Sequence, residues 1–70
     1  MTDPQIDLDL ALAARERATK AFKKAARLFA RNPHAFNYSA MEAAALHLQD
    51  ATYKVSCARS VLRDALHATT

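Results

Sequence analysis

Hydrophobic positions recur along most of the chain at spacings of three and four residues, which is the period of an amphipathic helix. In the first half the repeat consists of Leu8, Ala11, Arg15, Ala18, Phe22, Ala25 and Phe29, widened on one side by Ala14, Ala21 and Leu28. Most lysine and arginine side chains of this half fall on the opposite face. The pattern predicts a helix over residues 4–31, because Pro33 cannot continue a helix and restricts the residue before it.

Two overlapping capping signals mark the start of this predicted helix. Thr2 and Gln5 have the spacing of a capping box, and Asp3 followed by Pro4 is an equally acceptable N-cap. Residues 6–10 alternate between apolar and acidic positions with a period of two, as a strand would. Because the chain offers no second strand to pair with this segment, we expect it to be helical.

The second half begins with another capping box, formed by Ser39 and Glu42, which predicts a loop at 32–38 and a helix over 40–67. Behind the cap run heptads with large residues at one seam position and alanine at the other: Met41, Leu48, Val55 and Leu62, with Ala44, Ala51, Ala58 and Ala65. Alanine in alternate layers lets two helix backbones approach closely. Two helices of similar length with a short connection predict an all-α antiparallel hairpin, as a single domain over 1–70.

A second apolar stripe on the second helix lies away from this seam. It consists of Leu46, Tyr53, Cys57 and Val61. A surface helix needs only one apolar stripe, so two stripes predict two packing neighbours. One neighbour is the first helix, and the other is a second copy of the chain or a target. A domain of this size is marginally stable alone, which favours the second copy. We therefore expect a homodimer with this stripe as its interface, in the form of a four-helix bundle.

Charge is distributed unevenly along the chain. Residues 1–37 contain seven basic and four acidic side chains, whereas residues 38–70 contain three of each. The candidate partner-binding residues are the basic stripe and two aromatic residues of the predicted loop: Arg15, Lys20, Lys23, Lys24, Arg27, Arg31, Phe36 and Tyr38. The stripe is either a solvated face or an electrostatic contact surface. The aromatic residues either cap the end of the bundle or serve as anchors for a partner.

Composition and residue spacing give little support for catalysis. The absence of glycine excludes phosphate-cradling and dinucleotide-binding loops. Cys57 has no histidine one turn away, and His47 with Asp50 is at most an exposed helical pair. The histidines do not have the spacing of metal ligands. We expect no catalytic, cofactor or metal site, and hence a protein that is not an enzyme.

Location is inferred from three further features. No apolar run approaches the length of a membrane span, so no membrane association is expected. The N-terminus lacks the basic and apolar regions of a signal peptide, and the single cysteine cannot form an internal disulfide. These features predict a cytoplasmic protein, in a bacterial host if the chain is phage-encoded.

Two glycine-free helices joined at Asn32-Pro33, ahead of Ser39, resemble several families of small helical hairpins. The layout resembles the phage-encoded anti-activators that bind bacterial quorum-sensing transcription regulators as dimeric hairpins. It is also similar to the plasmid RNA-binding hairpin that dimerises with alternating alanine and leucine layers. The Asn-Pro connection is similar to that of type III secretion needle subunits, although the second half of their proline-rich loop is missing. All three resemblances rest on architecture.

Three functions therefore remain open. The favoured one is a non-enzymatic dimeric module, a small inhibitor or adaptor that sequesters a larger bacterial protein such as a transcription regulator. The second is an RNA- or DNA-binding hairpin that acts through the basic face of the first helix. The third is a secretion or filament subunit, which would form large assemblies.

Overall fold

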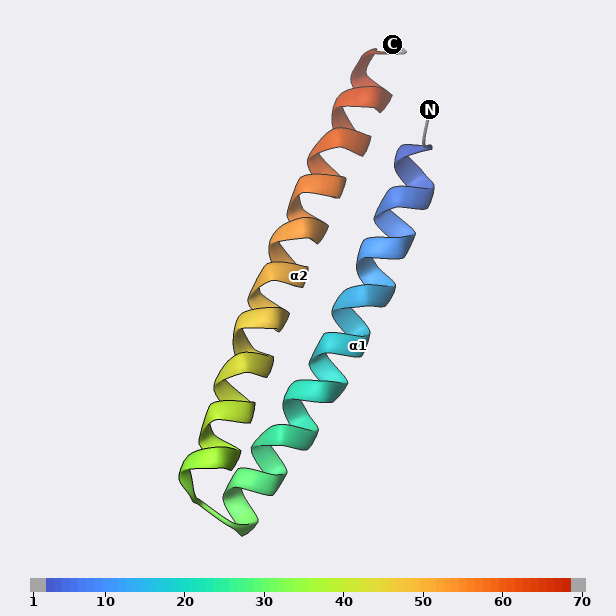
Figure 1. Cartoon of the computed structure of the whole chain (residues 1–70). Helices are drawn as coiled ribbons and strands as arrows, with labels where there is room; N and C mark the ends of the chain where they lie inside the picture. The colour runs from blue at the N-terminus through green and yellow to red at the C-terminus, as the bar shows by residue number, and fades with distance from the viewer. Residues whose placement is uncertain (1–2, 69–70) are drawn as a thin grey trace.

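The computed structural model describes residues 3–68 as two helices joined by a connection of three residues. Helix α1 spans Pro4–Arg31 and helix α2 spans Ala35–Ala68, and the described residues contain no strand. The helices lie side by side in opposite directions and form a rod of 55 × 17 × 13 Å (Figure 1). The predicted all-α helical hairpin is confirmed, and the bounds of α1 agree with the predicted range.

The start of α1 uses the second of the two capping signals. The Asp3 carboxylate accepts a hydrogen bond of 2.9 Å from the backbone N–H of Gln5. Pro4 occupies the first turn, where a missing N–H removes no hydrogen bond of the helix. The Gln5 side chain also donates to the Asp9 carboxylate at 3.1 Å. The alternative cap, Thr2, lies outside the described residues.

Helix α1 ends at the position that Pro33 dictates. Asn32 leaves the helical region, with φ −141° and ψ 81°, although its N–H still donates to the Leu28 carbonyl at 3.0 Å. A following proline disfavours the helical region for the residue before it, and Asn32 lies outside that region.

Helix α2 begins one turn earlier than the sequence predicts. The Nδ1 atom of His34 accepts a hydrogen bond of 3.1 Å from the backbone N–H of Phe36, and so caps the first turn. The Asn37 side chain donates to the Asn32 carbonyl at 2.9 Å, which ties the new helix to the end of α1.

The predicted loop at 32–38 and helix start at residue 40 are therefore wrong. The connection comprises residues 32–34, and Ser39 lies inside α2. The physical reason is that His34 and Asn37 already satisfy the polar groups around the first turn, so the helix does not need Ser39 as a cap.

The contact between the helices is narrow. Only Ala18, Ala51 and Val55 are buried among the described residues, with exposed fractions of 2%, 6% and 1%. All other positions of the α1 repeat from Leu8 to Phe29 and of the α2 heptad seam are partly buried. The predicted contact faces of both helices are therefore confirmed. Ala21 and Leu28, predicted to widen the α1 stripe, are instead exposed, because a single neighbouring helix covers only one strip of α1.

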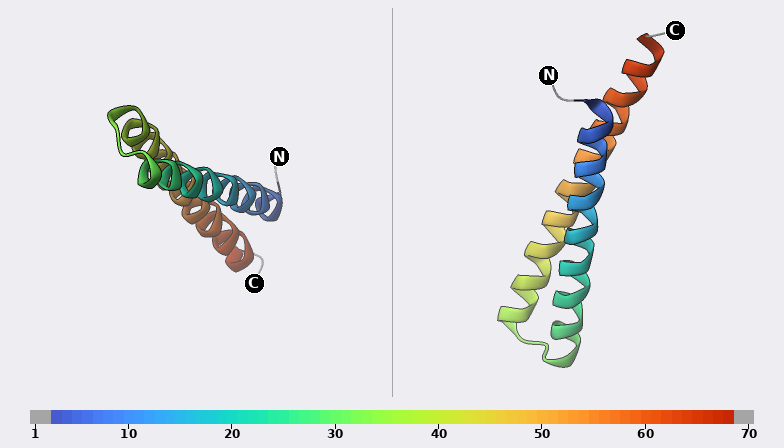
Figure 2. Two further views of the ribbon diagram at one scale, coloured as in Figure 1. Left: turned by 90° about the horizontal axis from the view of Figure 1, so that it is seen from below. Right: turned by 90° about the vertical axis from the view of Figure 1, so that its right-hand side faces the viewer.

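The helices cross at a small angle, and the last turns of α2 extend past the start of α1 (Figure 2). Helix α2 has 34 residues, whereas α1 has 28. At this open end of the hairpin the apolar side chains Ile6, Leu10 and Leu66 are each more than half exposed. The fold therefore positions almost every side chain at the surface of the rod.

Candidate functional site

The exposed face of α1 is strongly basic. We define this basic face by five exposed residues, Lys20, Lys23, Lys24, Arg27 and Arg31. From Arg17 to Met41 the chain contains six basic residues and no aspartate or glutamate. Among the described residues only Lys20 of these five forms an ion pair, with Glu16 just outside this stretch, so the other four create a positive potential over the half of α1 nearest the loop.

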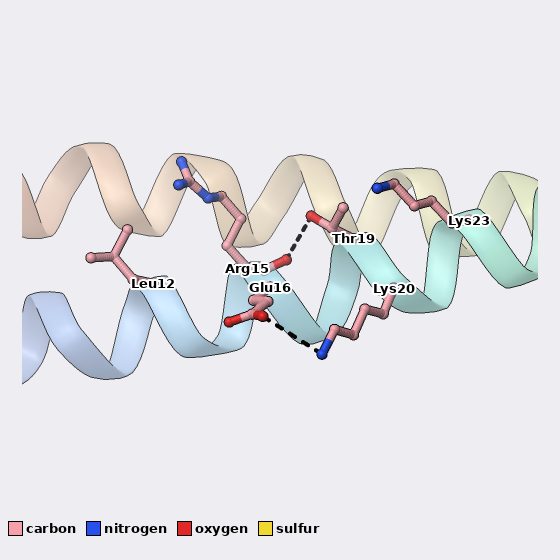
Figure 3. A pocket seen from close by; sticks show the side chains of 6 residues that line it. All are labelled: Leu12, Arg15, Glu16, Thr19, Lys20 and Lys23. Carbon is pink, nitrogen blue, oxygen red and sulfur yellow. Dashed lines mark hydrogen bonds and ion pairs between the residues drawn. The ribbon is translucent and has the colours of Figure 1, made fainter.

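A shallow depression adjoins the basic face (Figure 3). It is lined by Leu12, Arg15, Glu16, Thr19, Lys20 and Lys23. Glu16 and Lys20 form an exposed ion pair at 3.6 Å, and both point away from Arg15 and Lys23 (Figure 3). No salt bridge joins Arg15 or Lys23 to a carboxylate within residues 3–68. The depression therefore presents two cations without an acidic partner.

Arg15 belongs to the otherwise apolar repeat of α1, and it is partly buried. Its backbone carbonyl accepts a hydrogen bond of 2.9 Å from the Thr19 hydroxyl. In Figure 3 its side chain extends from α1 toward the side where α2 lies. A long side chain of this kind packs its stem on apolar neighbours and keeps its charged group at the surface.

A second, smaller depression lies toward the loop end of α1. It is lined by Lys24, Arg27, Leu28 and Arg31. Leu28 is 48% exposed and provides an apolar patch between three cations. Arginine is enriched at protein interfaces, so an apolar side chain beside Arg27 and Arg31 is a candidate contact surface.

Phe36 and Tyr38 lie in the first turn of α2 and not in the loop, which corrects their predicted location. The Tyr38 ring packs against the Phe29 ring of α1, with centroids 5.7 Å apart and planes tilted by 60°. Tyr38 is half exposed, whereas Phe36 is 75% exposed. The geometry of Tyr38 therefore agrees with a role in closing the end of the hairpin, while Phe36 projects from it.

The predicted dimer-interface residues Leu46, Tyr53, Cys57 and Val61 are all exposed in the single chain, and we call them the outer stripe of α2. Sequence reasoning missed the exposure of Ile6, Leu10 and Leu66 at the open end. Ile6 and Leu10 are one helical turn apart, and this spacing could have identified them as a separate apolar patch. The period-two alternation of residues 6–10 concealed it.

Tyr53 and Cys57 lie one turn apart on this stripe and interact. A side-chain hydrogen bond with Cys57, together with electrostatic repulsion from its charge and a smaller desolvation effect, raises the pKa of Tyr53 above its usual value. Both side chains are exposed, so this pair provides a spectroscopic probe of the stripe.

The residues considered for catalysis do not come together in the described chain. Asp50 forms an ion pair with Lys54 at 3.1 Å, in place of the contact with His47 that the sequence allowed. Within residues 3–68 no group of three or more His, Cys, Asp or Glu side chains is arranged to hold a metal ion. Neither described helix is both long and apolar enough to span a membrane.

Comparison with known proteins provides no relative. No known protein family matches the chain, and no curated protein or solved structure is significantly similar to it.

Proposed function

We propose that this chain is a non-enzymatic, homodimeric protein-binding module, a small inhibitor or adaptor that sequesters a larger bacterial protein such as a transcription regulator. The observation that carries the proposal is the stretch from Arg17 to Met41, which places six basic residues and no acidic residue on and around one exposed helix face. The surface that complements this face is an acidic patch on the partner.

At the same end of the rod, apolar and aromatic side chains add apolar burial to the charge interactions of the proposed contact. Leu28 lies among the cations of α1, and Phe36 projects from the first turn of α2. Arginine and aromatic side chains contribute most of the binding energy at protein interfaces. A partner that covers the loop half of α1 would bury both apolar groups and meet the cations around them.

Arg15 and Lys23 have a more specific role in this proposal. Arg15 is partly buried, so less side-chain freedom is lost when its guanidinium binds a carboxylate. Lys23 lies two turns along the same depression, with Thr19 between them. We expect the pair to receive two acidic side chains of a partner helix or strand, with Arg15 providing the more directional contact.

The test is capture from a bacterial lysate by the tagged chain, with Lys23→Glu and Arg27→Glu combined in one variant. The matched control combines Gln5→Glu and Ala13→Glu, which also makes the net charge more negative but lies at exposed positions of α1 near the open end, outside the basic face and the outer stripe of α2. We expect the first variant to lose at least tenfold in capture of a protein that the wild type and the control both retain. Equal capture by all three would refute the proposal for the basic face.

The same basic face supports nucleic-acid binding as the alternative function. Phosphate contacts release counterions, so the affinity would fall steeply as salt rises. Treating half of each lysate with nuclease separates the two functions. Capture that survives nuclease indicates a protein partner, whereas capture that disappears makes the alternative the leading function.

A further inference from the structure

We propose that two copies of the chain pair through the outer stripe of α2 in antiparallel orientation, with their loops at opposite ends of the dimer. This inference rests on the homodimer of the proposed function, and it specifies the contact face and the direction of pairing. The two α2 helices then lie in the middle of the assembly, with one α1 helix on each outer side.

The exposed area of the single chain favours a second copy as the occupant of this stripe. The chain exposes 5492 Å², whereas a compact monomer of its mass of 7.7 kDa exposes about 4,300 Å². The excess is about 1,200 Å² per chain, or roughly 2,400 Å² for two chains, which lies in the range of permanent homodimer interfaces. A dimer that buries this area would leave each chain with about the exposed surface of a compact monomer of the same mass.

Helix α2 is the helix whose outer side is apolar. Among residues 3–68, six of the nine large apolar side chains that are exposed belong to α2. Leu46 and Tyr53 each precede a seam residue by two positions, which is a rotation of about 200° around the helix. Leu46, Tyr53 and Cys57 therefore lie on nearly the opposite side of α2 from α1, with Val61 about 100° from the seam on one flank. A second copy that covers this stripe leaves the basic face of α1 uncovered.

The charges of α2 determine the direction of pairing. Residues 35–51 contain Glu42 and Asp50 and no lysine or arginine, so this half carries a charge of −2. The other half, residues 52–68, contains Lys54, Arg59, Arg63 and the single acid Asp64, so its charge is +2. Parallel pairing would place halves of like charge together, whereas antiparallel pairing places each half against its opposite. The helix dipoles favour the same direction.

The spacing of the stripe allows an antiparallel two-fold contact, in which each residue of one copy meets a different residue of the other. A two-fold axis that passes between Tyr53 and Lys54 places Leu46 against Val61 of the second copy. The same axis brings the two Tyr53 rings together at the centre of the contact. Asp50 then lies opposite Cys57 and close to Lys54 of the second copy. In this register Leu46 pairs with Val61 and the two Tyr53 rings meet, while Cys57 lies beside Asp50.

This arrangement gives the proposed binding module two equivalent partner sites. Each basic face lies on an outer side of the dimer, and the two loop ends lie at opposite ends of a rod that is 55 Å long for the single chain. Two partner molecules therefore bind independently, one on each side.

Disulfide trapping tests the arrangement. Two variants are prepared, Leu46→Cys and Val61→Cys, each with Cys57→Ser to remove the native thiol. They are mixed in equal amounts and oxidised, and the products are identified by mass. We expect the mixed disulfide between the two variants and neither symmetric one, because two copies of residue 46 would be about 22 Å apart along the helices. A disulfide needs Cα atoms within about 7 Å.

The controls distinguish the other outcomes. Ala13→Cys with Cys57→Ser places a thiol on the exposed surface of α1 and should not cross-link. Symmetric disulfides of either stripe variant, or of Cys57 in the wild type, would show parallel pairing and overturn the inference. A dimeric mass by sedimentation without any disulfide, or a monomeric mass, would also overturn it. Partner capture by the basic face is measured in a separate experiment. The protein-binding proposal can therefore succeed or fail independently of the direction in which the dimer pairs.

Discussion

Replacing Val55 by alanine tests how much of the fold depends on its few buried positions. Val55 has the largest fully buried side chain of the described residues, with 1% of its surface exposed. The substitution removes two methyl groups, which costs about 1.6 kcal/mol at roughly 0.8 kcal/mol for each. The cavity that remains adds to this loss, so we expect a total of about 2 kcal/mol. In a chain of this size that corresponds to a fall of about 8–16 °C in Tm.

The assay is thermal unfolding followed by circular dichroism, at two protein concentrations a hundredfold apart. The matched variant is Val61→Ala, the same chemical change at a position that is 56% exposed in the single chain. Val55→Ala should lower Tm by a similar amount at both concentrations. Val61→Ala should change Tm by little in the dilute sample, because exposed substitutions usually cost less than about 0.5 kcal/mol. In the concentrated sample it should lower Tm more, because it weakens the proposed dimer.

Two results would refute this reasoning. If Val55→Ala left Tm unchanged, the seam between the helices would not be the source of stability. If Val61→Ala cost as much as Val55→Ala in the dilute sample, Val61 would be buried within the single chain. Equal Tm values for the wild type at both concentrations would argue against self-association.

Two further predictions concern the seam and the outer stripe. Ala51→Leu should destabilise the hairpin by about 1–3 kcal/mol in the same assay, because the buried Ala51 has no space for a larger side chain. The control Ala43→Leu on the exposed surface should cost less than about 0.5 kcal/mol. Cys57→Ala should lower the pKa of Tyr53 toward its usual value, because it removes both the hydrogen bond and the repulsive charge that raise it. Spectrophotometric titration in a Tyr38→Phe background, where Tyr53 is the sole tyrosine, measures this shift, and an unchanged pKa would contradict the assigned cause.

The seams and α1 were predictable because local chemistry determines them. Asp3 and Pro4 suit the first turn of α1, and Pro33 excludes any extension beyond its end. The repeat of large residues and alanine specified which side of α2 meets α1, since only that side allows close approach. The buried positions Ala51 and Val55 both belong to this repeat.

The start of α2 was not predictable from local signals alone. Ser39 with Glu42 is a common capping pattern, and histidine is not among the residues preferred as caps. The structure nevertheless uses His34, because the Asn37 side chain bonds to the carbonyl of Asn32 across the connection. That contact exists only once the two helices have folded together. The exposure of Leu28 was missed for a related reason, since helical spacing does not reveal how wide a strip the neighbour covers.

The alanine layers link stability to binding in this fold. Small side chains bring the two helices close together, but they also leave little apolar volume between them, so only three described residues are buried. The remaining apolar surface lies on the outer stripe of α2, near the basic face of α1 and at the open end of the hairpin. A ligand that binds only the folded chain stabilises it by about 2.7 kcal/mol at a hundred times its dissociation constant. Occupation of either surface should therefore raise Tm, and a second copy that binds through α2 would stabilise the hairpin before any partner reaches α1.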